Sequence, residues 1–419
     1  MSGSAMRAGS RSPADQVGGG FIALYALAYL STALLFIAPL LVTLALKVNS
    51  LVGIDRAPAS LSLIAGVGAL VSIVANPFFG QLSDRTTSRF GMRRPWMIAG
   101  LVGGSTGILV VALAPNVAVV LLGWCMAQLF FNALLAAQVA VLPDQVPVVQ
   151  RGTVAGILGV CLPLASVGGT YVVNVFAGHE LAMFLVPCAI GGVFVVLFAL
   201  VLDDRRLEPA DRTPWSSRRV LEAFYVDPRG HPDFMWAFAS RFLFVLAYAL
   251  LVTYQAYFLL DRLGSAEDDV PHQIFLGTLA QAAVLVTASV VGGRLSDRTG
   301  RRKVFVVGGS FVYGVALFLV AMATDVHGFL VGMAVSGLGF GLYMAVDLAL
   351  VVDVLPDEAT AAKDLGVLNI AGALPFTLAP VIAPAILVVG SGSYVALYCV
   401  AAACALLAGL AILPVRRVR

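Results

Sequence analysis

One short motif occurs twice in this chain, and its spacing constrains the fold more than any other feature. Gly80-Gln81-Leu82-Ser83-Asp84-Arg85-Thr86 is repeated as Gly293-Arg294-Leu295-Ser296-Asp297-Arg298-Thr299. Leu142-Pro143-Asp144 is likewise repeated as Leu355-Pro356-Asp357, and the difference 355 − 142 equals the difference 293 − 80. We call this common difference the repeat offset. Two unrelated motifs rarely share one offset by chance, so the sequence predicts a duplicated chain with two parallel halves.

The composition places both halves in a lipid bilayer, because 60% of the 419 residues are hydrophobic and only 12% are charged. The mean hydropathy is +0.95. Helices of about 20 apolar residues cross a hydrocarbon core about 30 Å thick. Such segments are predicted at 21–46, 59–82, 95–114, 117–141, 153–177, 181–202, 235–260, 273–292, 304–323, 328–354, 366–389 and 392–414. The prediction is an all-α membrane protein with twelve transmembrane helices in two pseudo-symmetric six-helix bundles, since strands of a barrel would alternate in polarity.

The same pattern divides the chain into five parts. They are an N-terminal tail (1–20), a first six-helix bundle (21–202), a linker (203–234), a second six-helix bundle (235–414) and a short C-terminal tail (415–419). Residues 220–225 of the linker fit a short amphipathic helix on the membrane surface, and a plain tether is the alternative. The N-terminal tail lacks the pattern of a cleaved signal, so the first helix is expected to serve as the signal.

The distribution of Lys and Arg predicts the orientation, because basic residues in short loops stay on the cytoplasmic side. With the N-terminus inside, all of the 26 Lys and Arg residues except Lys47, Arg56, Arg241 and Arg262 lie in cytoplasmic tails and loops. We therefore expect an integral plasma (inner) membrane protein with both termini in the cytoplasm. The net charge of +3 then reflects topology, and no nucleic-acid partner is inferred from it.

The sequence also predicts that the chain is not an enzyme. All five cysteines lie within apolar segments, where Cys behaves as a small hydrophobe, and the four histidines lie in loops or at helix ends. There is no metal-ligand spacing, no phosphate-binding loop and no nucleophile motif. We expect no cofactor and no metal, and a monomer whose surroundings are the lipid bilayer.

The two motif copies with their basic continuations, Gly80 to Arg94 and Gly293 to Arg302, resemble the loops after the second and eighth helices of the major facilitator superfamily. The longer first loop, Ser83 to Trp96, more narrowly resembles the glycoside-pentoside-hexuronide symporters and the related sucrose-proton symporters. Gln150-Arg151-Gly152 after the fourth helix is similar as well. The resemblance covers the whole chain and implies a secondary transporter that moves a small solute by alternating access.

These loops carry the predicted gate. Gly80 and Gly293 would allow helices to approach closely, and Asp84 and Asp297 would pair with arginines and accept from helix-end amides. We expect a charge lock across the two halves that opens and closes the cytoplasmic side. The alternative is that the same charges only fix the topology. The predicted gating residues are Gly80, Asp84, Arg85, Arg93, Arg94, Asp144, Arg151, Gly293, Asp297, Arg298, Arg301 and Arg302.

Three ionisable residues within the predicted helices are the candidates for proton coupling, since each costs about 2.5–3.5 kcal/mol on insertion scales. They are Arg241 in the seventh helix and Asp347 and Asp353 in the tenth. By the superfamily resemblance, helices one, four, seven and ten line the central cavity. Helices seven and ten run in opposite directions, so Arg241 and Asp347 are expected at a similar depth. Opening and closing such a pair would change the proton affinity of the carboxylate. A static ion pair is the alternative.

Amides and phenols in the predicted helices suit a neutral, hydroxylated ligand. Gln128 and Asn132 are separated by one helical turn, so they share one helix face. The predicted substrate-binding residues are Gln128, Asn132, Gln138, Tyr254, Gln255, Tyr257, Gln281, Tyr343 and Asn369. The alternative for each is a polar side chain that joins two membrane helices.

Three functions remain open from the sequence. The first is a proton-coupled sugar or glycoside symporter, although the first helix has no acidic residue. The second is a proton-coupled efflux antiporter for drugs or amphiphilic metabolites, although the fifth helix has only part of the glycine-proline pattern of that branch. The third is a membrane receptor or scaffold without transport, for which a larger soluble domain is expected.

Overall fold

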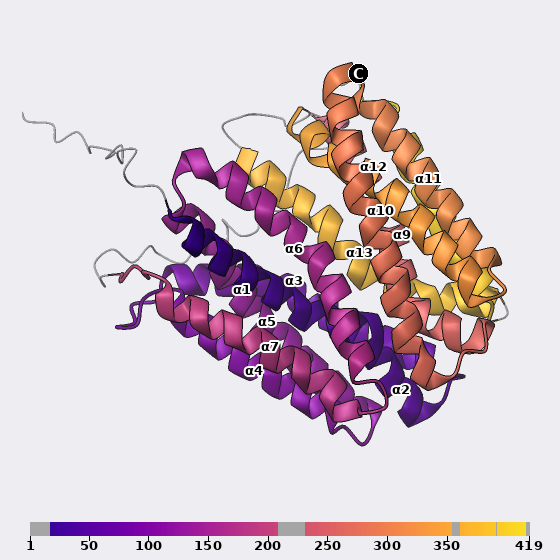
Figure 1. Ribbon diagram of the computed structural model, residues 1–419, viewed down its shortest axis with the longest axis horizontal. Helices are drawn as coiled ribbons and strands as arrows, with labels where there is room; N and C mark the ends of the chain where they lie inside the picture. Colours follow the sequence, from indigo (N-terminus) through magenta and orange to yellow (C-terminus); the bar gives the residue numbers. More distant parts are fainter. Residues whose placement is uncertain (1–16, 208–230, 354–360, 391, 416–419) are drawn as a thin grey trace, which may run out of the picture.

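A computed structural model describes residues 17–207, 231–353, 361–390 and 392–415 (Figure 1). The helix predicted at 220–225 lies outside these residues, as do 1–16 of the N-terminal tail and 416–419 of the C-terminal tail. Within the described part, twelve helical segments are long and apolar enough to cross a membrane. The predicted fold class is confirmed.

The first bundle begins with one long bent span in which α1 continues through a π-helical turn into α2. Its elements are α1 (Gly19–Ala38), η2 (Pro39–Thr43), α2 (Leu44–Val52), α3 (Ala57–Asp84), α4 (Arg94–Ala112), α5 (Val117–Gln145), α6 (Val148–Val175) and α7 (Glu180–Val201). The first span reaches Val52, beyond the predicted end at residue 46. Lys47 does not end the helix because it is buried and paired with Glu180, with 2.7 Å between Nζ and Oε1.

The second bundle repeats this order. Its elements are α9 (Pro232–Tyr257), η4 (Phe258–Arg262), η5 (Glu267–Asp269), α10 (Val270–Thr299), α11 (Arg302–Met322), α12 (Val326–Asp353), α13 (Ala361–Val389) and α14 (Tyr394–Ala411). The starts of α1 and α9 differ by the repeat offset, and so do the starts of α3 and α10. The helix contacts also correspond, because α3 packs on α5 as α10 packs on α12, and α1 packs on α6 as α9 packs on α13.

Glycines let the helices within each bundle approach closely. A Cβ added at Gly107 of α4 would lie 2.5 Å from the Ala127 amide nitrogen of α5. A Cβ added at Gly339 of α12 would lie 2.4 Å from the Tyr313 amide nitrogen of α11. Both distances are shorter than any side chain tolerates, so these contacts need glycine. Small residues serve this purpose in membrane helices, where packing replaces the hydrophobic effect as the force between helices.

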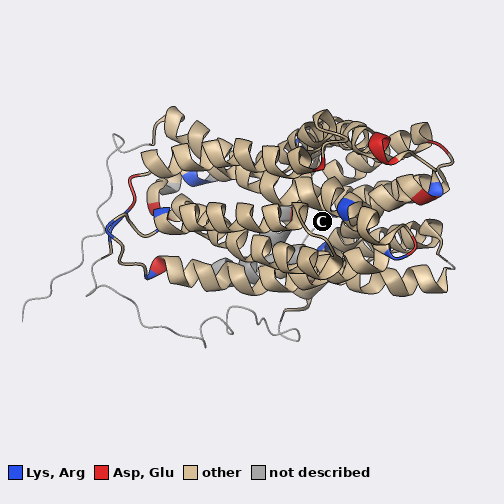
Figure 2. Cartoon of the chain, turned by 90° about the horizontal axis from the view of Figure 1, so that it is seen from below, with Lys and Arg blue, Asp and Glu red and all other residues tan. Residues whose placement is uncertain are grey.

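The two bundles converge at one membrane face and diverge at the other (Figure 1). We call the diverging face the basic face, because α3 ends and α4 begins there within the Arg-rich motif, and α10 and α11 meet there likewise. The converging face is called the opposite face. Charged residues lie mainly at helix ends, and the long middle parts of the helices are largely uncharged (Figure 2).

Contacts between the bundles lie at the opposite face. The hydroxyls of Ser62 in α3 and Tyr254 in α9 are 2.5 Å apart. The Tyr257 hydroxyl donates to the carbonyls of Ala45 at 3.2 Å and Ala57 at 3.3 Å. These hydrogen bonds join the first span and α3 to α9, so the path between the bundles is closed on this side.

Candidate functional site

A cavity of about 780 Å³ lies between the bundles and extends from mid-membrane towards the basic face. Most of its lining is apolar or aromatic, and most of it comes from the first bundle. The lining residues are Tyr25, Tyr29, Ala33, Phe36, Ile37, Leu40, Leu41, Ser72, Asn132, Leu135, Val139, Leu142, Ala155, Leu158, Gly159, Leu162, Ser166, Arg241, Tyr248, Val252 and Phe376. A small solute with a large apolar surface fits such a lining.

Arg241 is the charged residue of this lining, and it is paired. Its Nη1 lies 3.0 Å from Oδ2 of Asp347 on α12, and the two side chains are 18% and 6% exposed. Asp347 Oδ2 makes this ionic contact without a hydrogen bond of acceptable geometry. The structure therefore brings together the two charges that the sequence placed at similar depth. Their part in proton coupling stays a prediction.

Aromatic and small residues hold the pair in place. Tyr343, one turn before Asp347 on α12, stacks on Phe244 with ring centroids 3.7 Å apart and an angle of 7° between the rings. Its hydroxyl is 3.4 Å from that of Ser240, which precedes Arg241. Gly372 of α13 lies beside the guanidinium, since an added Cβ would be 3.9 Å from Arg241 Nε. The cation thus has the open cavity on one side and packed helices on the others.

Asn132 is the predicted substrate residue that lines the central cavity. Its Nδ2 donates to the Gln128 carbonyl at 2.8 Å and lies 3.5 Å from the Gln128 side-chain oxygen. Its Oδ1 accepts from Asn76 at 3.3 Å. Gln128 lines an adjoining cavity of about 200 Å³ together with Trp124. The two cavities share Phe36, Leu40, Ser72 and Phe376, so the amide pair forms a polar edge where they meet.

Five other predicted substrate residues contact neighbouring helices and do not line the central cavity. Tyr254 and Tyr257 join the bundles at the opposite face. Gln138 donates to the Ala28 carbonyl at 3.4 Å. Gln281 donates to Ser336 at 2.8 Å. Tyr343 packs behind Arg241.

The remaining three predicted residues are Gln255, Asn369 and Asp353. Gln255 is 1% exposed, and its Oε1 makes no hydrogen bond to any described residue. Asn369 lies within α13 and Asp353 at the end of α12, and the surroundings of both side chains are outside the described part.

The predicted gating residues at the basic face form a cluster around Arg93 in the first bundle. Its Nη1 lies 2.6 Å from Asp84 Oδ1, and its Nε lies 2.9 Å from Asp144 Oδ2. Burial acts to lower the pKa of Arg93, but the hydrogen bond and charge of Asp144, with those of Asp84, outweigh burial and raise it. The cluster joins the ends of α3 and α5 to the start of α4.

The neighbouring arginines are also bound within the first bundle. Asp204 Oδ2 accepts from the backbone amides of Arg93 and Arg94, both at 2.8 Å. Arg151 donates to the carbonyls of Val146 and Pro143, each at 2.9 Å. These contacts of the described residues thus lie within one half, and a lock across both halves stays a prediction for a different conformation.

The second copy of the motif is less defined. Arg298 and Arg301 are exposed at the basic face. Arg302 is the first residue of α11, and the side chain of Asp297 lies outside the described part. In the first copy, Arg85 directly follows the last residue of α3.

The two glycines of the motif have few described neighbours. A Cβ added at Gly80 would meet no described atom within 4 Å, and one added at Gly293 would meet only the Ala345 Cβ at 3.9 Å. The side chains at the start of α13, the helix that packs on α3, lie outside the described part. A close helix approach at these glycines therefore stays a prediction.

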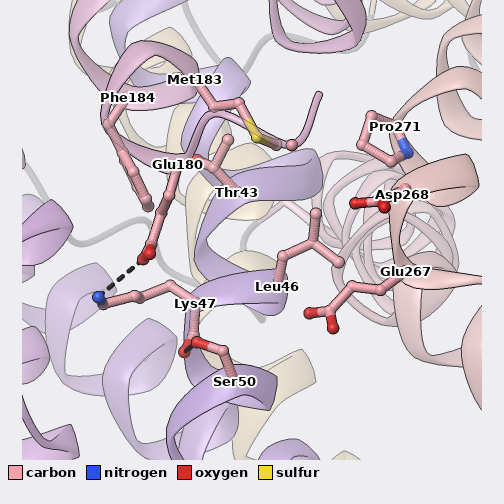
Figure 3. A pocket seen from close by; sticks show the side chains of 11 residues that line it. Thr43, Leu46, Lys47, Ser50, Glu180, Met183, Phe184, Glu267, Asp268 and Pro271 are labelled. Carbon is pink, nitrogen blue, oxygen red and sulfur yellow. Dashed lines mark hydrogen bonds and ion pairs between the residues drawn. The ribbon is translucent and has the colours of Figure 1, made fainter. Parts of the chain in front are cut away.

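A separate cavity of about 240 Å³ lies at the opposite face (Figure 3). Figure 3 shows Lys47 pointing to Glu180, with Glu267 and Asp268 facing from the second bundle. Lys47 also donates to the Ala112 carbonyl at 2.9 Å. This cavity shares no lining residue with the central one. It is small and strongly charged, so it is a poor candidate for the main binding site.

Sequence reasoning missed the aromatic lining of the central cavity, which includes Tyr25, Tyr29, Phe36 and Phe376. An aromatic residue in a membrane helix gives no signal of its own, because lipid, helix packing and a cavity all accept it. The signal that could have found three of them was the helix order, since Tyr25, Tyr29 and Phe36 belong to the first helix, which the resemblance already placed at the cavity.

A family model described as Major Facilitator Superfamily matches residues 20–266 and 267–419. Among solved structures, the chain is similar to the nucleoside transporter NupG, with a TM-score of 0.72 and 13% identity over 94% of this chain and 99% of that one. It is also similar to a bacterial homologue of the human lysosomal transporter Spinster in an inward-facing, unoccupied conformation. There the TM-score is 0.65 and the identity is 14% over 94% of this chain and 97% of that one.

The sequence relatives match a shorter stretch. The multidrug resistance protein MdtL of Citrobacter koseri is 30% identical over 148 residues, which is 34% of this chain and 37% of that protein. MdtL of Klebsiella pneumoniae is 34% identical over 110 residues, which is 26% of this chain and 28% of that protein. The match thus covers 37% and 28% of the length of these two relatives.

Proposed function

The chain belongs to the Major Facilitator Superfamily, and from this premise we propose that it is a proton-coupled transporter of an amphiphilic, glycoside-like solute. Family and fold establish the coarser statement, which is a transporter that works by alternating access and is not an enzyme. Proton coupling, substrate class and direction are the proposal. The observation that carries it is the Arg241–Asp347 pair at the wall of the central cavity.

The pair is suited to exchange a proton with substrate movement. A carboxylate in an apolar interior is stable only while a cation or a proton compensates its charge. Asp347 is 6% exposed and depends on Arg241, whose guanidinium also faces the cavity. A solute that takes a hydrogen bond from Arg241 would weaken the pair and favour protonation of Asp347. Substrate occupancy and proton binding are then coupled through one contact.

The cavity lining supports an amphiphilic substrate. Its polar groups are few and lie on two sides, with Asn132 and Ser72 in the first bundle and Arg241 and Tyr248 in the second. Aromatic and aliphatic residues fill the rest. A glycoside with an apolar aglycone matches this division, because its hydroxyls would reach the polar groups while its apolar part packs on the aromatic rings.

We assign the basic face to the cytoplasm, so that the cavity faces inward. The assignment rests on the excess of Arg at that face and on the positive-inside tendency. The likeness in fold to a Spinster homologue in an inward-facing conformation supports it. In this orientation a symporter would release its substrate from the described conformation, and an antiporter would load its substrate there.

Proton-coupled efflux of drugs or amphiphilic metabolites is the second candidate. It is favoured by the largely apolar lining and by relatives that are named multidrug resistance proteins. The same ion pair would serve either direction. The two candidates differ in whether proton and solute move together or in opposite directions.

Thermal-shift screening of the purified protein against glycosides, sugars and cationic drugs would identify a ligand, and proteoliposome transport would give the direction. The proposal predicts accumulation of a glycoside that requires an inward proton gradient. Proton release from loaded vesicles on addition of a cationic drug would favour efflux instead. Ligand binding without any transport would support a receptor and contradict both candidates.

A further inference from the structure

Two seams between the bundles border the central cavity. The bundles meet along two seams, α3 against α13 and α6 against α10. At the first seam the helices touch, since a Cβ added at Gly66 of α3 would lie 3.6 Å from the Val381 side chain and 3.9 Å from that of Pro380. At the second seam α6 lines the cavity through Ala155, Leu158, Gly159, Leu162 and Ser166, and α10 contributes none of the lining.

A small pocket lies next to the central cavity, at this second seam. Its volume is about 50 Å³, and it lies between Leu162, Pro163 and Ser166 of α6 and Thr278, Gln281 and Leu285 of α10. Leu162, Ser166 and Tyr248 line both the small pocket and the central cavity. The two spaces are therefore neighbours, separated by at most these side chains.

The helices that border this seam leave large apolar side chains uncovered. On α6, Leu162 is 54% exposed, and on α10, Val286 and Val290 are 46% and 47% exposed. A Cβ added at Gly159 would meet no described atom within 4 Å. α6 and α10 touch near the opposite face, where the rings of Tyr171 and Phe275 have centroids 5.4 Å apart. From there they diverge towards the basic face (Figure 1).

We propose that the seam between α6 and α10 is a lateral portal through which an amphiphilic solute enters or leaves the central cavity directly from the hydrocarbon region of the bilayer. The proposal rests on the proposed function for the identity of the solute as an amphiphile. The uncovered Leu162 side chain lines the pocket and is compatible with acyl chains, and Ser166, Gln281 and Tyr248 supply polar groups to the same pocket. The apolar part of a solute can stay in contact with lipid while its polar part passes to Arg241.

The test uses access to one cavity residue and needs no transport. Ser72 lines the central cavity, and Ser72→Cys is nearly isosteric. In the full-length chain with its five native cysteines replaced by alanine, the protein is placed in lipid nanodiscs. The rate of modification at position 72 is then measured with a long-chain alkyl maleimide, which partitions into lipid, and with a sulfonated maleimide, which stays in water.

A bulky residue at the portal should affect the modification rates of the two reagents differently. Leu162→Trp should slow the alkyl maleimide about tenfold more than the sulfonated maleimide, equivalent to about 1.4 kcal/mol. Leu164→Trp is the matched control, because Leu164 is 51% exposed on the same helix but lines neither cavity. It should change neither rate. If Leu162→Trp does not fold, Gly159→Trp serves as the second portal variant.

Other patterns overturn the portal. They are equal slowing of both reagents by the portal variant, slowing of neither, or the same slowing of the alkyl maleimide by Leu164→Trp. The modification rates do not depend on coupling between proton and substrate movement. A selective effect of Leu162→Trp together with absent proton-coupled transport would keep the portal and refute the proposed function, and the reverse combination would do the opposite.

Discussion

The two bundles share one scaffold, but they use charge in different places. In the second bundle, Arg241 and Asp347 form an ion pair at membrane depth. The residues that correspond to them in the first bundle by the repeat offset are Ala28 and Leu134, and both are fully buried and apolar. The described ion pairs of the first bundle lie near its two membrane faces, with Lys47–Glu180 at the opposite face and the pairs of Arg93 at the basic face. Duplication thus supplied the scaffold to both halves, and a buried charge pair is found at these positions in only one.

The two sets of charges also differ in solvation. Asp84 and Asp144 are 55% and 41% exposed, so water can replace either partner of Arg93 at little expense. Asp347 is 6% exposed, and loss of Arg241 would leave it without compensation. We therefore interpret the Arg93 cluster as a set of ion pairs that can exchange partners with water during conformational change. We interpret the Arg241–Asp347 pair as a site where protonation of Asp347 changes the stability of the pair.

The largest expected effect is that of Asp347→Asn, which fixes a neutral side chain at the proposed proton site. Gradient-driven accumulation of substrate should be lost, while counterflow exchange, which needs no net proton movement, should be spared. Both are measured in proteoliposomes. Asp325→Asn is the matched control, because Asp325 lies outside the spans and accepts from the Gly328 amide at 2.7 Å. Accumulation that survives in Asp347→Asn would place the proton site elsewhere.

The next largest effect concerns stability. Arg241→Met leaves Asp347 buried and unpaired, which should destabilise the protein by about 3–5 kcal/mol, measured as loss of thermal stability in detergent. Arg241→Met combined with Asp347→Leu makes the second bundle as apolar as the first at these positions. The double variant should recover stability but remain unable to accumulate substrate. Equal destabilisation in both variants would show that packing, and not an unpaired charge, is responsible.

A smaller effect is expected where the two bundles meet. Tyr254→Phe removes the hydroxyl that contacts Ser62, and one neutral hydrogen bond contributes about 0.5–1.5 kcal/mol. The population should shift towards a conformation open at the opposite face, which accessibility of a cysteine at that face would detect. Tyr398→Phe is the control, since the Tyr398 hydroxyl has no hydrogen bond to a described residue. The same shift in both variants would refute a role for the bond.

The smallest effect is expected from Asp84→Asn in the first bundle. The pair with Arg93 is partly exposed on the acidic side, so its loss should change stability by at most about 1 kcal/mol. If the cluster exchanges partners during transport, the transport rate should fall more than the affinity for substrate. Unchanged transport would show that these charges only fix the topology. The first bundle would then differ from the second in carrying no charge that acts in transport at this cluster.

The fold was predictable because it depends on patterns that the sequence repeats, namely twelve apolar segments and one repeat offset shared by two motifs. The Arg241–Asp347 contact was predictable because charges at membrane depth are few and must compensate one another. The end of the first span was not predictable from the sequence, because Lys47 stays in the helix through its pairing with Glu180 at the start of α7. Pairing between such distant parts of the sequence has no local pattern.

The cavity lining was harder to predict than the fold. An amide in a membrane helix can line a cavity, as Asn132 does, or bond to the next helix, as Gln281 does with Ser336. Which of the two occurs depends on the rotation of each helix, and that is determined by close contacts such as Gly339 against Tyr313. The offset between the halves does not contain this information.

The central claim is that Asp347 carries the proton that moves with substrate. The most direct measurement is proton uptake or release on substrate binding, recorded with a pH-sensitive dye in weakly buffered detergent solution, using a ligand found by thermal-shift screening. The wild-type protein should exchange protons with the solution when the ligand is added, and Asp347→Asn should bind the ligand without doing so. Equal proton exchange by both proteins would contradict the account.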